Sequence, residues 1–391
     1  MTGESLKLMI CALEPSGDAL GAALMAALRR KRPNVVFIGC GGPLMAAEGL
    51  DSLFPIDRFS VIGPGAALMA LPAALKAIDR LARAAREERP AGAVFIDSWT
   101  FSSMAAARLK KEAPGVARIK YVAPQVWASR PRRAETIKRS FDGVMCLFGF
   151  EPGRFTQNGI DARRVGHPGF QSARAHATDN AAFRAKHGVG DAPLLAVLPG
   201  SRNGELKRLA APFGETVKKV VAEIPQARIV VAAAPALADR LPSIVGDWAG
   251  SPVIVGPEEK FDAFAAADAA LAASGTATVE LAIFNTPMTV AYRVDPLTEI
   301  WARRVLTTPY ASLVNIAAGR LVSPEFLQQD CDPARMAAAL IPLLRGGSER
   351  EAQLAAFPAI VETLAGGETP AAEAAAGAVL EWTMRKSSSP Y

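Results

Sequence analysis

Two loops in the second half of the sequence carry residues that are suited to holding a phosphate. The first is a turn of small and hydroxylated residues: Ser274, Gly275, Thr276, Ala277 and Thr278. A helical pattern follows from Val279, so backbone N–H groups, hydroxyls and the positive end of a helix dipole can all face an anion there. The alternative is that Ser and Thr merely cap the helix.

The residues around this turn indicate a sugar nucleotide as the ligand. Glu280 stands just inside the helix, where its carboxylate can reach the hydroxyls of a sugar. In the second loop, Gly200 and Ser201 expose backbone, and Arg202 can grip a phosphate oxygen through its fork of donors. Together the two loops offer donors for a diphosphate and an acceptor for a sugar hydroxyl.

The first half of the sequence has polar residues at the ends of its strand-like runs. A polar turn comes after the first run, with Glu14, Ser16, Gly17 and Asp18. Gly41 and Gly42 follow the second run, and there the backbone can approach a ligand closely. Helix capping by Ser16 or Asp18 and a tight structural turn at the glycines are the alternatives.

Asp97 ends the third run, where a carboxylate can take a proton from an alcohol nucleophile. Capping of the next helix is the alternative role. A basic segment with Arg130, Arg132 and Arg133 follows the fourth run. It predicts either a solvated face or a surface for an acceptor phosphate or anionic lipid.

These loops need strands to position them, and short apolar runs do alternate with helical patterns along the chain. The runs span 6–13, 34–40, 91–97, 118–124, 143–148, 193–200, 227–234, 251–256, 269–274 and 287–294. Strands that are apolar throughout and alternate with helices favour parallel sheets covered on both faces. We therefore predict an α/β protein of two Rossmann-like, doubly wound domains that face a cleft.

The polar stretch 169–180 separates the two series of runs. It predicts an N-terminal acceptor and membrane-side domain at 1–170 and a C-terminal sugar-nucleotide-binding domain at 171–355. A helical segment at 356–391 is expected to pack back on the N-terminal domain. Ligands of such sheets bind beyond the carboxyl ends of the strands, so the polar loops should gather there.

Composition limits the classes of protein. The 391 residues include 44 Lys and Arg against 38 Asp and Glu, which suits anionic substrates, a membrane surface or nucleic acid. The four cysteines form no CxxC pair, so reduced thiols in the cytoplasm are expected. The N-terminus lacks the pattern of a secretory signal, and no apolar run reaches the roughly 18 residues that span a bilayer.

A peripheral membrane contact is predicted for the segment 60–78, which is apolar over most of its length and has no charge before Lys76. Leu68, Met69 and Leu71 would meet acyl chains, while Arg130, Arg132 and Arg133 would meet anionic headgroups. A buried core helix is the alternative for this segment.

In its ordered set of motifs the sequence resembles the lipid-A-disaccharide synthase family, whose members are inverting glycosyltransferases with the two-Rossmann fold called GT-B. The matching stretches are EPSGD at 14–18, GGPLMAAEG at 41–49, Asp97, YVAPQVWA at 121–128, FEP at 150–152, VGHP at 165–168, LPGSR at 198–202, ASGTATVE at 273–280 and YASLVNIAAGR at 310–320. Such enzymes transfer an acylated glucosamine from UDP-2,3-diacylglucosamine to 2,3-diacylglucosamine 1-phosphate and release UDP.

The resemblance implies roles for individual residues. Asp97 would be the general base for the 6-hydroxyl of the acceptor, Arg202 would bind phosphate, and the turn 274–280 would hold UDP. Asn315 matches a further motif on the donor side. Gln125 and Trp127 are expected in the acceptor loops with Glu14, Ser16, Gly17, Asp18, Gly41 and Gly42.

The resemblance also implies the partners and location of the protein. It predicts no metal or other cofactor, because helix dipoles and Arg202 can stabilise the leaving diphosphate. The partners are the two acylated substrates and the cytoplasmic leaflet of the inner membrane, without nucleic acid. The choice between a monomer and a homodimer stays open.

Some positions depart from the family pattern, and other functions stay open. Leu13 stands where glycine is common, Ala66 replaces an acidic residue, and 99–102 reads Trp-Thr-Phe-Ser in place of a Pro-Asp-Phe-Asn type run. A UDP-sugar epimerase, a nucleic-acid-binding module and a non-catalytic protein that binds acylated sugars are the rival functions. The scarcity of stacking aromatics disfavours nucleic acid.

Overall fold

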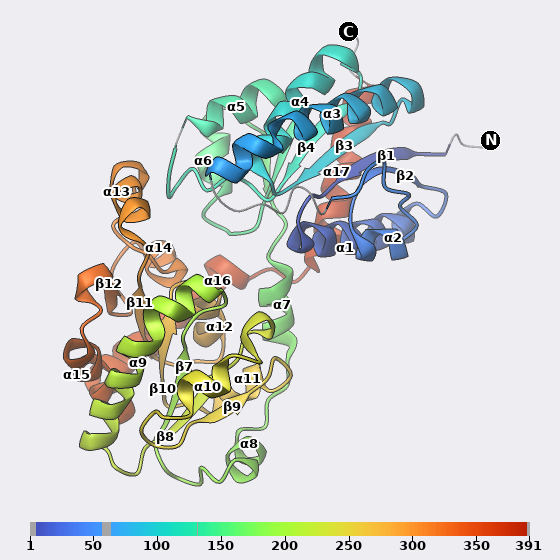
Figure 1. Ribbon diagram of the computed structural model, residues 1–391. Helices are drawn as coiled ribbons and strands as arrows, with labels where there is room; N and C mark the ends of the chain where they lie inside the picture. Colours follow the sequence, from blue (N-terminus) through green and yellow to red (C-terminus); the bar gives the residue numbers. More distant parts are fainter. Residues whose placement is uncertain (1–4, 57–63, 131, 389–391) are drawn as a thin grey trace. The chain divides into compact units, whose positions relative to one another are not determined.

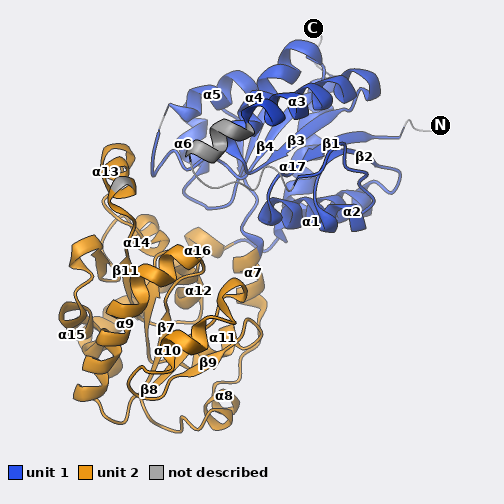
Figure 2. Cartoon of the chain, viewed as in Figure 1, with its two compact units in different colours: residues 1–168, 367–391 blue, residues 169–366 orange. Residues whose placement is uncertain are grey.

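The computed structural model describes residues 5–56, 64–130 and 132–388, without the side chains of 64–70 and 297. The chain forms two compact units (Figure 2). Unit 1 combines Met1–Pro168 with Gly367–Tyr391, and unit 2 is Gly169–Gly366. Unit 2 is therefore an insertion between two pieces of unit 1.

Unit 1 is built on a six-stranded parallel sheet with the order β2-β1-β3-β4-β5-β6 (Figure 1). Its strands are β1 (Lys7–Cys11), β2 (Val36–Cys40), β3 (Gly92–Ile96), β4 (Ala117–Tyr121), β5 (Gly143–Cys146) and β6 (Ala162–Arg164). Its helices are α1 (Pro15–Lys31), α2 (Pro43–Ala47), α3 (Pro64–Glu88), α4 (Trp99–Glu112), α5 (Arg133–Ser140), α6 (Pro152–Thr156) and α17 (Ala371–Ser387).

Unit 2 has a second six-stranded parallel sheet, with the order β12-β11-β10-β7-β8-β9. Its strands are β7 (Leu194–Leu198), β8 (Arg228–Ala232), β9 (Val253–Val255), β10 (Ala269–Ala273), β11 (Met288–Tyr292) and β12 (Glu325–Leu327). Its helices are α7 (Pro168–Ala175), α8 (Asn180–Lys186), α9 (Asn203–Glu223), α10 (Leu241–Val245), α11 (Lys260–Ala266), α12 (Ala277–Ile283), α13 (Pro296–Val305), α14 (Leu313–Ala318), α15 (Pro333–Leu344) and α16 (Ser348–Ala365), with 3-10 turns at Pro235–Leu237 and Gln328–Asp330.

The two doubly wound α/β sheets confirm the fold class predicted from the sequence. Each predicted apolar run overlaps a strand, because strands covered on both faces are mostly apolar. The edge strands β6 and β12 were not predicted, since they have three residues each and read ARR and EFL. The start of the predicted C-terminal segment, residue 356, also differs from the structure. Residue 356 lies within α16 of unit 2, and the chain returns to unit 1 only at Gly367.

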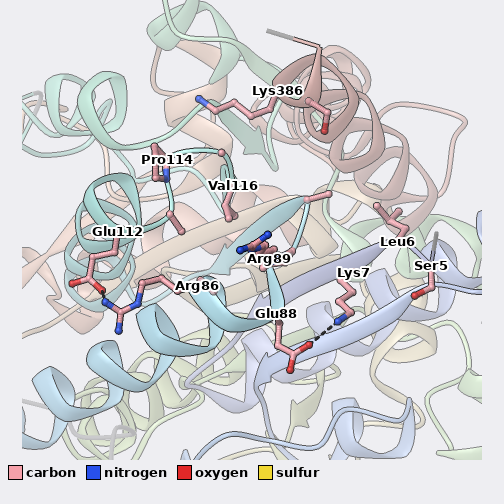
Figure 3. Close-up of a pocket in the computed structure, with 16 residues that line it drawn as sticks. Ser5, Leu6, Lys7, Arg86, Glu88, Arg89, Glu112, Pro114, Val116 and Lys386 are labelled. Carbon is pink, nitrogen blue, oxygen red and sulfur yellow. Dashed lines mark hydrogen bonds and ion pairs between the residues drawn. The ribbon is translucent and has the colours of Figure 1, made fainter. Parts of the chain in front are cut away.

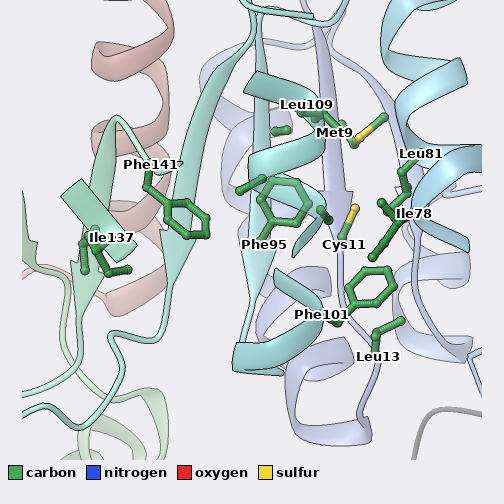
Figure 4. Close-up of a cluster of buried hydrophobic side chains, with 14 of the residues drawn as sticks. Met9, Cys11, Leu13, Ile78, Leu81, Phe95, Phe101, Leu109, Ile137 and Phe141 are labelled. Carbon is green, nitrogen blue, oxygen red and sulfur yellow. The ribbon is translucent and has the colours of Figure 1, made fainter. Parts of the chain in front are cut away.

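Two apolar layers cover the faces of the first sheet. Met9, Cys11 and Phe95 face α3, α4 and α5, whereas the alternate residues Leu8 and Ile10 face α1 and α17. Figure 4 shows the first layer, where Leu13 lies beside Phe101. Leu13 is buried in this layer, so its departure from the family pattern changes the core rather than an exposed acceptor surface. The cysteines Cys11, Cys40, Cys146 and Cys331 are buried free thiols.

Helix α17 packs closely against the sheet of unit 1 because two strand residues that face it are glycines. A side chain at Gly143 would collide with the ring of Trp382, and one at Gly92 would collide with Thr383. The indole Nε1 of Trp382 also donates to Asp161 Oδ2 at 2.8 Å. The close approach of this helix therefore depends on glycine in β3 and β5.

Helix α3 is amphipathic over the part whose side chains are described. Ile78 and Leu81 are buried against the sheet, while Leu71 and Leu75, one turn apart, are 39% and 46% exposed. Leu68, Met69 and Ala66 belong to residues whose side chains lie outside the description. None of the helices in the described ranges has both the length and the apolar character that crossing a bilayer requires.

A buried carboxylate joins three of the sequence motifs at the carboxyl edge of unit 1. Glu151 is 2% exposed and accepts from Trp127 Nε1 at 3.1 Å, Leu147 N at 2.9 Å and Phe148 N at 3.0 Å. Burial raises the pKa of Glu151, and these three donors oppose the rise. The ring of His167 stacks on Phe148 with centroids 6.2 Å apart. The motifs at 121–128, 150–152 and 165–168 thus share one packed cluster.

His167 gives unit 1 a testable pH dependence. Burial lowers the pKa of His167 from 6.5 to about 4, so the unfolded chain binds a proton near pH 6 that the folded chain does not. The stability that His167 contributes is present above pH 6.5 and is lost as the pH falls toward 4. Relative to His167→Phe, the wild type should lose about 2 kcal/mol of unfolding free energy between pH 7 and pH 5, measured by urea unfolding. An equal pH dependence in both proteins would contradict this assignment.

Candidate functional site

The polar loops gather where each sheet reverses its strand order. In unit 1 the reversal lies between β1 and β3, and in unit 2 it lies between β7 and β10. Loops that leave such neighbouring strands in opposite directions open a crevice at the carboxyl edge of the sheet. The sequence-predicted residues Glu14 and Asp97 follow β1 and β3, and Arg202 and Ser274 follow β7 and β10.

Asp97 lies in an unusual turn between β3 and α4. Asp97 and Ser98 both have left-handed backbone conformations, with φ of 48° and 39°. Ser98 Oγ donates to Glu14 Oε1 at 2.8 Å, which brings two of the predicted site residues, Glu14 and Asp97, to the same edge. Adjacent left-handed residues other than glycine are strained and concentrate at functional sites. The Asp97 side chain is half-buried rather than enclosed.

Lys120 lies beneath this turn and was not predicted from the sequence. Its side chain comes from β4, and the whole residue is 1% exposed. Burial lowers the pKa of Lys120 to about 7, while the carboxylates of Asp97 and Glu14 act to raise it. The available signal was a lysine within the otherwise buried strand Ala117–Tyr121, where a charge is costly without partners.

The other predicted residues of the first loops hold the fold together. Asp18 is 3% exposed, and its carboxylate accepts from Gly42 N at 2.8 Å, Leu44 N at 2.9 Å and Met45 N at 3.1 Å. It therefore caps α2, and a side chain at Gly42 would collide with it. Gly17 is buried, whereas Ser16 is exposed at the start of α1. Of this group, only Ser16 and Glu14 keep polar groups within reach of solvent.

Of the predicted residues in the loop after β4, one packs inside the protein and the others lie at the surface. Trp127 is half-buried and bonded to Glu151, whereas Gln125 is exposed. Beyond them, Arg130, Arg132 and Arg133 line a cavity of about 520 Å³ together with Trp99. The Arg133 guanidinium lies 5.2 Å from the centre of the Trp99 ring, and burial and the charge of Arg130 lower its pKa.

In unit 2, the loop after β7 wraps around a carboxylate that was not predicted. Glu205 accepts from Ser201 N at 2.8 Å and from the hydroxyl of Tyr292 at 3.2 Å. Gly200 has a φ of 115°, and a side chain there would collide with Glu205. Arg202 approaches Glu205 at 3.5 Å, yet its side chain stays 75% exposed. The amide of Ser201 is therefore occupied, whereas the Arg202 guanidinium can move.

The turn after β10 has an open side and a buried side. Gly275 and Thr276 are exposed, and nothing within 4 Å would meet a side chain added at Gly275. Thr278 is fully buried and donates to Gly275 O at 2.8 Å, and Ser274 Oγ donates to Ala311 O at 2.8 Å. Both hydroxyls stabilise the turn, and its exposed backbone is the part that can meet a ligand.

Glu280 is paired with Lys260, another residue that was not predicted. Lys260 Nζ lies 2.9 Å from both carboxylate oxygens of Glu280. The Glu280 side chain is 12% exposed and that of Lys260 is 29% exposed. A carboxylate has about four lone-pair directions. Glu280 can therefore accept sugar hydroxyls while Lys260 holds it in place.

Asn315 lies inside unit 2 and bonds only to protein groups. It is fully buried, and its Nδ2 donates to Ser323 O at 2.8 Å and Glu325 Oε1 at 2.7 Å. Its Oδ1 accepts from Val322 N at 2.8 Å and Ser323 N at 3.0 Å. All four hydrogen-bonding positions of the amide are filled. Asn315 therefore joins α14 to β12 and holds the segment that receives the Ser274 hydroxyl.

A larger cavity lies at the opposite edge of unit 1. Its volume is about 850 Å³, and it opens at the amino ends of β1, β3 and β4, with the Lys7–Glu88 ion pair on its wall (Figure 3). Parallel α/β sheets bind ligands at the carboxyl edge, so this cavity is separate from the site around Asp97. No group of histidine, cysteine and acidic residues within the described ranges is arranged to hold a metal ion.

The chain matches the family described as LpxB, lipid-A-disaccharide synthetase, over residues 8–379. A lipid-A-disaccharide synthase of Rhodospirillum centenum is 40% identical, covering 96% of this chain and 94% of the relative. The enzyme of that name from Ruegeria pomeroyi is 42% identical, covering 97% and 96%. The one from Pseudomonas aeruginosa is 39% identical, covering 98% and 100%.

Solved structures show the same fold at low sequence identity. A putative UDP-N-acetylglucosamine 2-epimerase from Listeria monocytogenes aligns with a TM-score of 0.59 at 12% identity, covering 96% of this chain and 95% of that one. The calicheamicin glycosyltransferase CalG4 aligns with a TM-score of 0.58 at 16% identity, covering 99% and 100%. At these identities the likeness concerns the fold and not the reaction.

Proposed function

Because the chain belongs to the lipid-A-disaccharide synthetase family, we propose that it carries out an inverting sugar transfer. The protein is a glycosyltransferase with lipid-A-disaccharide synthase activity. The donor is UDP-2,3-diacylglucosamine, and the acceptor is 2,3-diacylglucosamine 1-phosphate. The products are UDP and a β-1,6-linked disaccharide 1-phosphate.

The observation that carries this proposal is the position of Asp97. It follows β3 at the strand reversal of unit 1, in a strained turn, with a half-buried carboxylate. As general base, Asp97 takes the proton of the acceptor's 6-hydroxyl while that oxygen attacks the anomeric carbon of the donor. The bond from this carbon to the diphosphate breaks at the same time, and UDP leaves with the electron pair.

Unit 2 holds the donor. Arg202 is mostly exposed and turns its guanidinium from Glu205 to the diphosphate, where a charge-assisted contact stabilises the leaving group. The exposed backbone of Gly275 and Thr276 faces a phosphate oxygen, and Glu280 accepts hydroxyls of the nucleotide sugar. The buried Asn315 and Thr278 and the half-buried Ser274 keep these loops in place without touching the donor.

A putative UDP-sugar epimerase has the same fold, so the reaction class needs a test of its own. An epimerase changes its UDP-sugar without any acceptor, whereas a transferase needs both substrates. Mass spectrometry of purified protein with donor alone, and then with donor and acceptor, separates the two. Disaccharide and UDP that form only in the complete mixture support the transferase.

Asp97→Asn should lower kcat by about two to four orders of magnitude, because the amide cannot accept the proton. UDP affinity, measured by calorimetry, should change little because the donor binds to unit 2. Ser103→Ala on the neighbouring helix is the control and should keep its activity. A nearly normal kcat for Asp97→Asn would exclude Asp97 as the base.

Arg202→Ala should weaken UDP binding and lower turnover together. The lost charge-assisted contact is worth about 1.5–3 kcal/mol, which corresponds to a roughly 10- to 150-fold weaker Kd for UDP. Lys218→Ala, at an exposed position on helix α9, which follows Arg202, is the matched control. If UDP affinity stays unchanged in Arg202→Ala, this arginine does not bind the diphosphate.

We also propose that unit 1 binds the membrane surface from which both acylated substrates come. The exposed Leu71 and Leu75 offer an apolar stripe on α3, and Arg130, Arg132 and Arg133 offer positive charge beside Trp99. Shallow apolar insertion combined with a basic surface is sufficient for peripheral binding. The membrane expected is the anionic cytoplasmic leaflet of the inner membrane.

Leu71→Glu combined with Leu75→Glu should abolish binding to vesicles of anionic phospholipid, because two carboxylates cannot enter the apolar layer. Both leucines are exposed, so the melting temperature and UDP affinity should be preserved. Raised salt should weaken vesicle binding by the wild type. Met384→Glu, an exposed apolar position on α17, is the control, and normal vesicle sedimentation of the double variant would place the membrane surface elsewhere.

A further inference from the structure

Lys120 is an ionisable side chain in the interior of unit 1. It stands in β4, between β3 and β5, and the whole residue is 1% exposed. A buried charge is tolerated when it is hydrogen-bonded on all sides. The partners of this ammonium therefore explain why it is placed there.

All of the partners of Lys120 Nζ lie at the carboxyl ends of β3 and β4 or at the start of α4. The ammonium donates to Phe95 O at 3.3 Å, to Tyr121 O at 3.2 Å and to Ser102 Oγ at 3.4 Å, and it makes a short contact with the carbonyl oxygen of Asp97. The hydroxyl of Ser102 donates to the same Asp97 oxygen at 2.7 Å. Two side chains thus converge on one backbone carbonyl.

This carbonyl belongs to the strained turn. Its residue, Asp97, and the next, Ser98, both have positive φ, which neither side chain favours. The amide of Asp97 donates to Tyr121 O at 3.0 Å, and Ser98 is held by Glu14. The backbone of Asp97 is therefore anchored at both its N–H and its C=O, while the residue remains half-exposed.

We propose that Lys120 is a positioning residue for the transfer reaction, which holds the Asp97 carbonyl and thereby sets the direction of the Asp97 carboxylate. The inference rests on the proposed role of Asp97 as general base. Lys120 touches neither substrate, and Ser102 is its partner in holding the turn.

The first test compares Lys120→Met with Lys110→Met, an exposed lysine on α4 that bonds to Arg139 O. A shift of about 1 Å in a catalytic group can cost about 100-fold in rate, so Lys120→Met should lower kcat by roughly 10- to 100-fold. The KM for donor and the Kd for UDP should stay within about two-fold, because unit 2 is untouched. A normal kcat in a folded Lys120→Met protein would overturn the proposal.

The second test asks whether Lys120 acts through Asp97. In an Asp97→Asn background, Lys120→Met should lower kcat by no more than about two-fold, because effects on one catalytic unit are not additive. An equal loss in both backgrounds would overturn the proposal. A nearly normal kcat for Asp97→Asn would instead show that Asp97 is not the general base. The failure of the proposed function is thus distinguishable from the failure of the role proposed for Lys120.

If Lys120→Met does not fold, Ser102→Ala tests the role of the Asp97 carbonyl without removing a buried ionisable group. It removes one hydrogen bond to the Asp97 oxygen, and kcat should fall by about five-fold with the donor KM unchanged. Ser103→Ala, the neighbouring hydroxyl on the same helix, is the control. Equal kcat values for Ser102→Ala and Ser103→Ala would contradict the proposed role of this carbonyl.

Discussion

Each sheet reverses its strand order once, and the rest of the structure depends on that constraint. Loops on the two sides of the reversal turn away from each other, so polar groups collect there without having to enter the apolar core. In unit 1 the reversal carries Glu14 and Asp97, and in unit 2 it carries Arg202 and Ser274. The candidate site residues thereby lie at one edge of each sheet, although they are far apart in sequence.

Buried or half-buried ionisable side chains hold the loops at these edges in place. Lys120 supports the Asp97 turn, Glu205 fills the loop before Arg202, and Lys260 aligns Glu280. Glu205 accepts from the amide of Ser201, so this amide is already bonded, whereas Arg202 and the backbone of Gly275 and Thr276 are exposed. Ionisable side chains of the protein itself thus hold these loops in their conformations.

The sequence was sufficient to predict ten of the twelve strands that the structure describes, because parallel strands covered on both faces are mostly apolar. It also predicted polar loops at the carboxyl ends of these strands, where the structure places them. It did not separate exposed polar residues from those that hold the structure together: Asp18, Trp127 and Asn315 were predicted as site residues, yet the side chains of all three are bonded inside the protein. Lys120 escaped prediction because its partners are mainly backbone carbonyls, which no residue pattern reveals.

The return of α17 to unit 1 sets an order of events during synthesis. The 198 residues of unit 2, 169–366, separate the first piece of unit 1 from this helix. At about 5–20 residues per second, roughly 10–40 s pass between the two pieces. For that time the glycine-lined groove over β3 and β5, which Trp382 and Thr383 later fill, remains open. On the ribosome, unit 2 can complete its core before helix α17 of unit 1 has been synthesised.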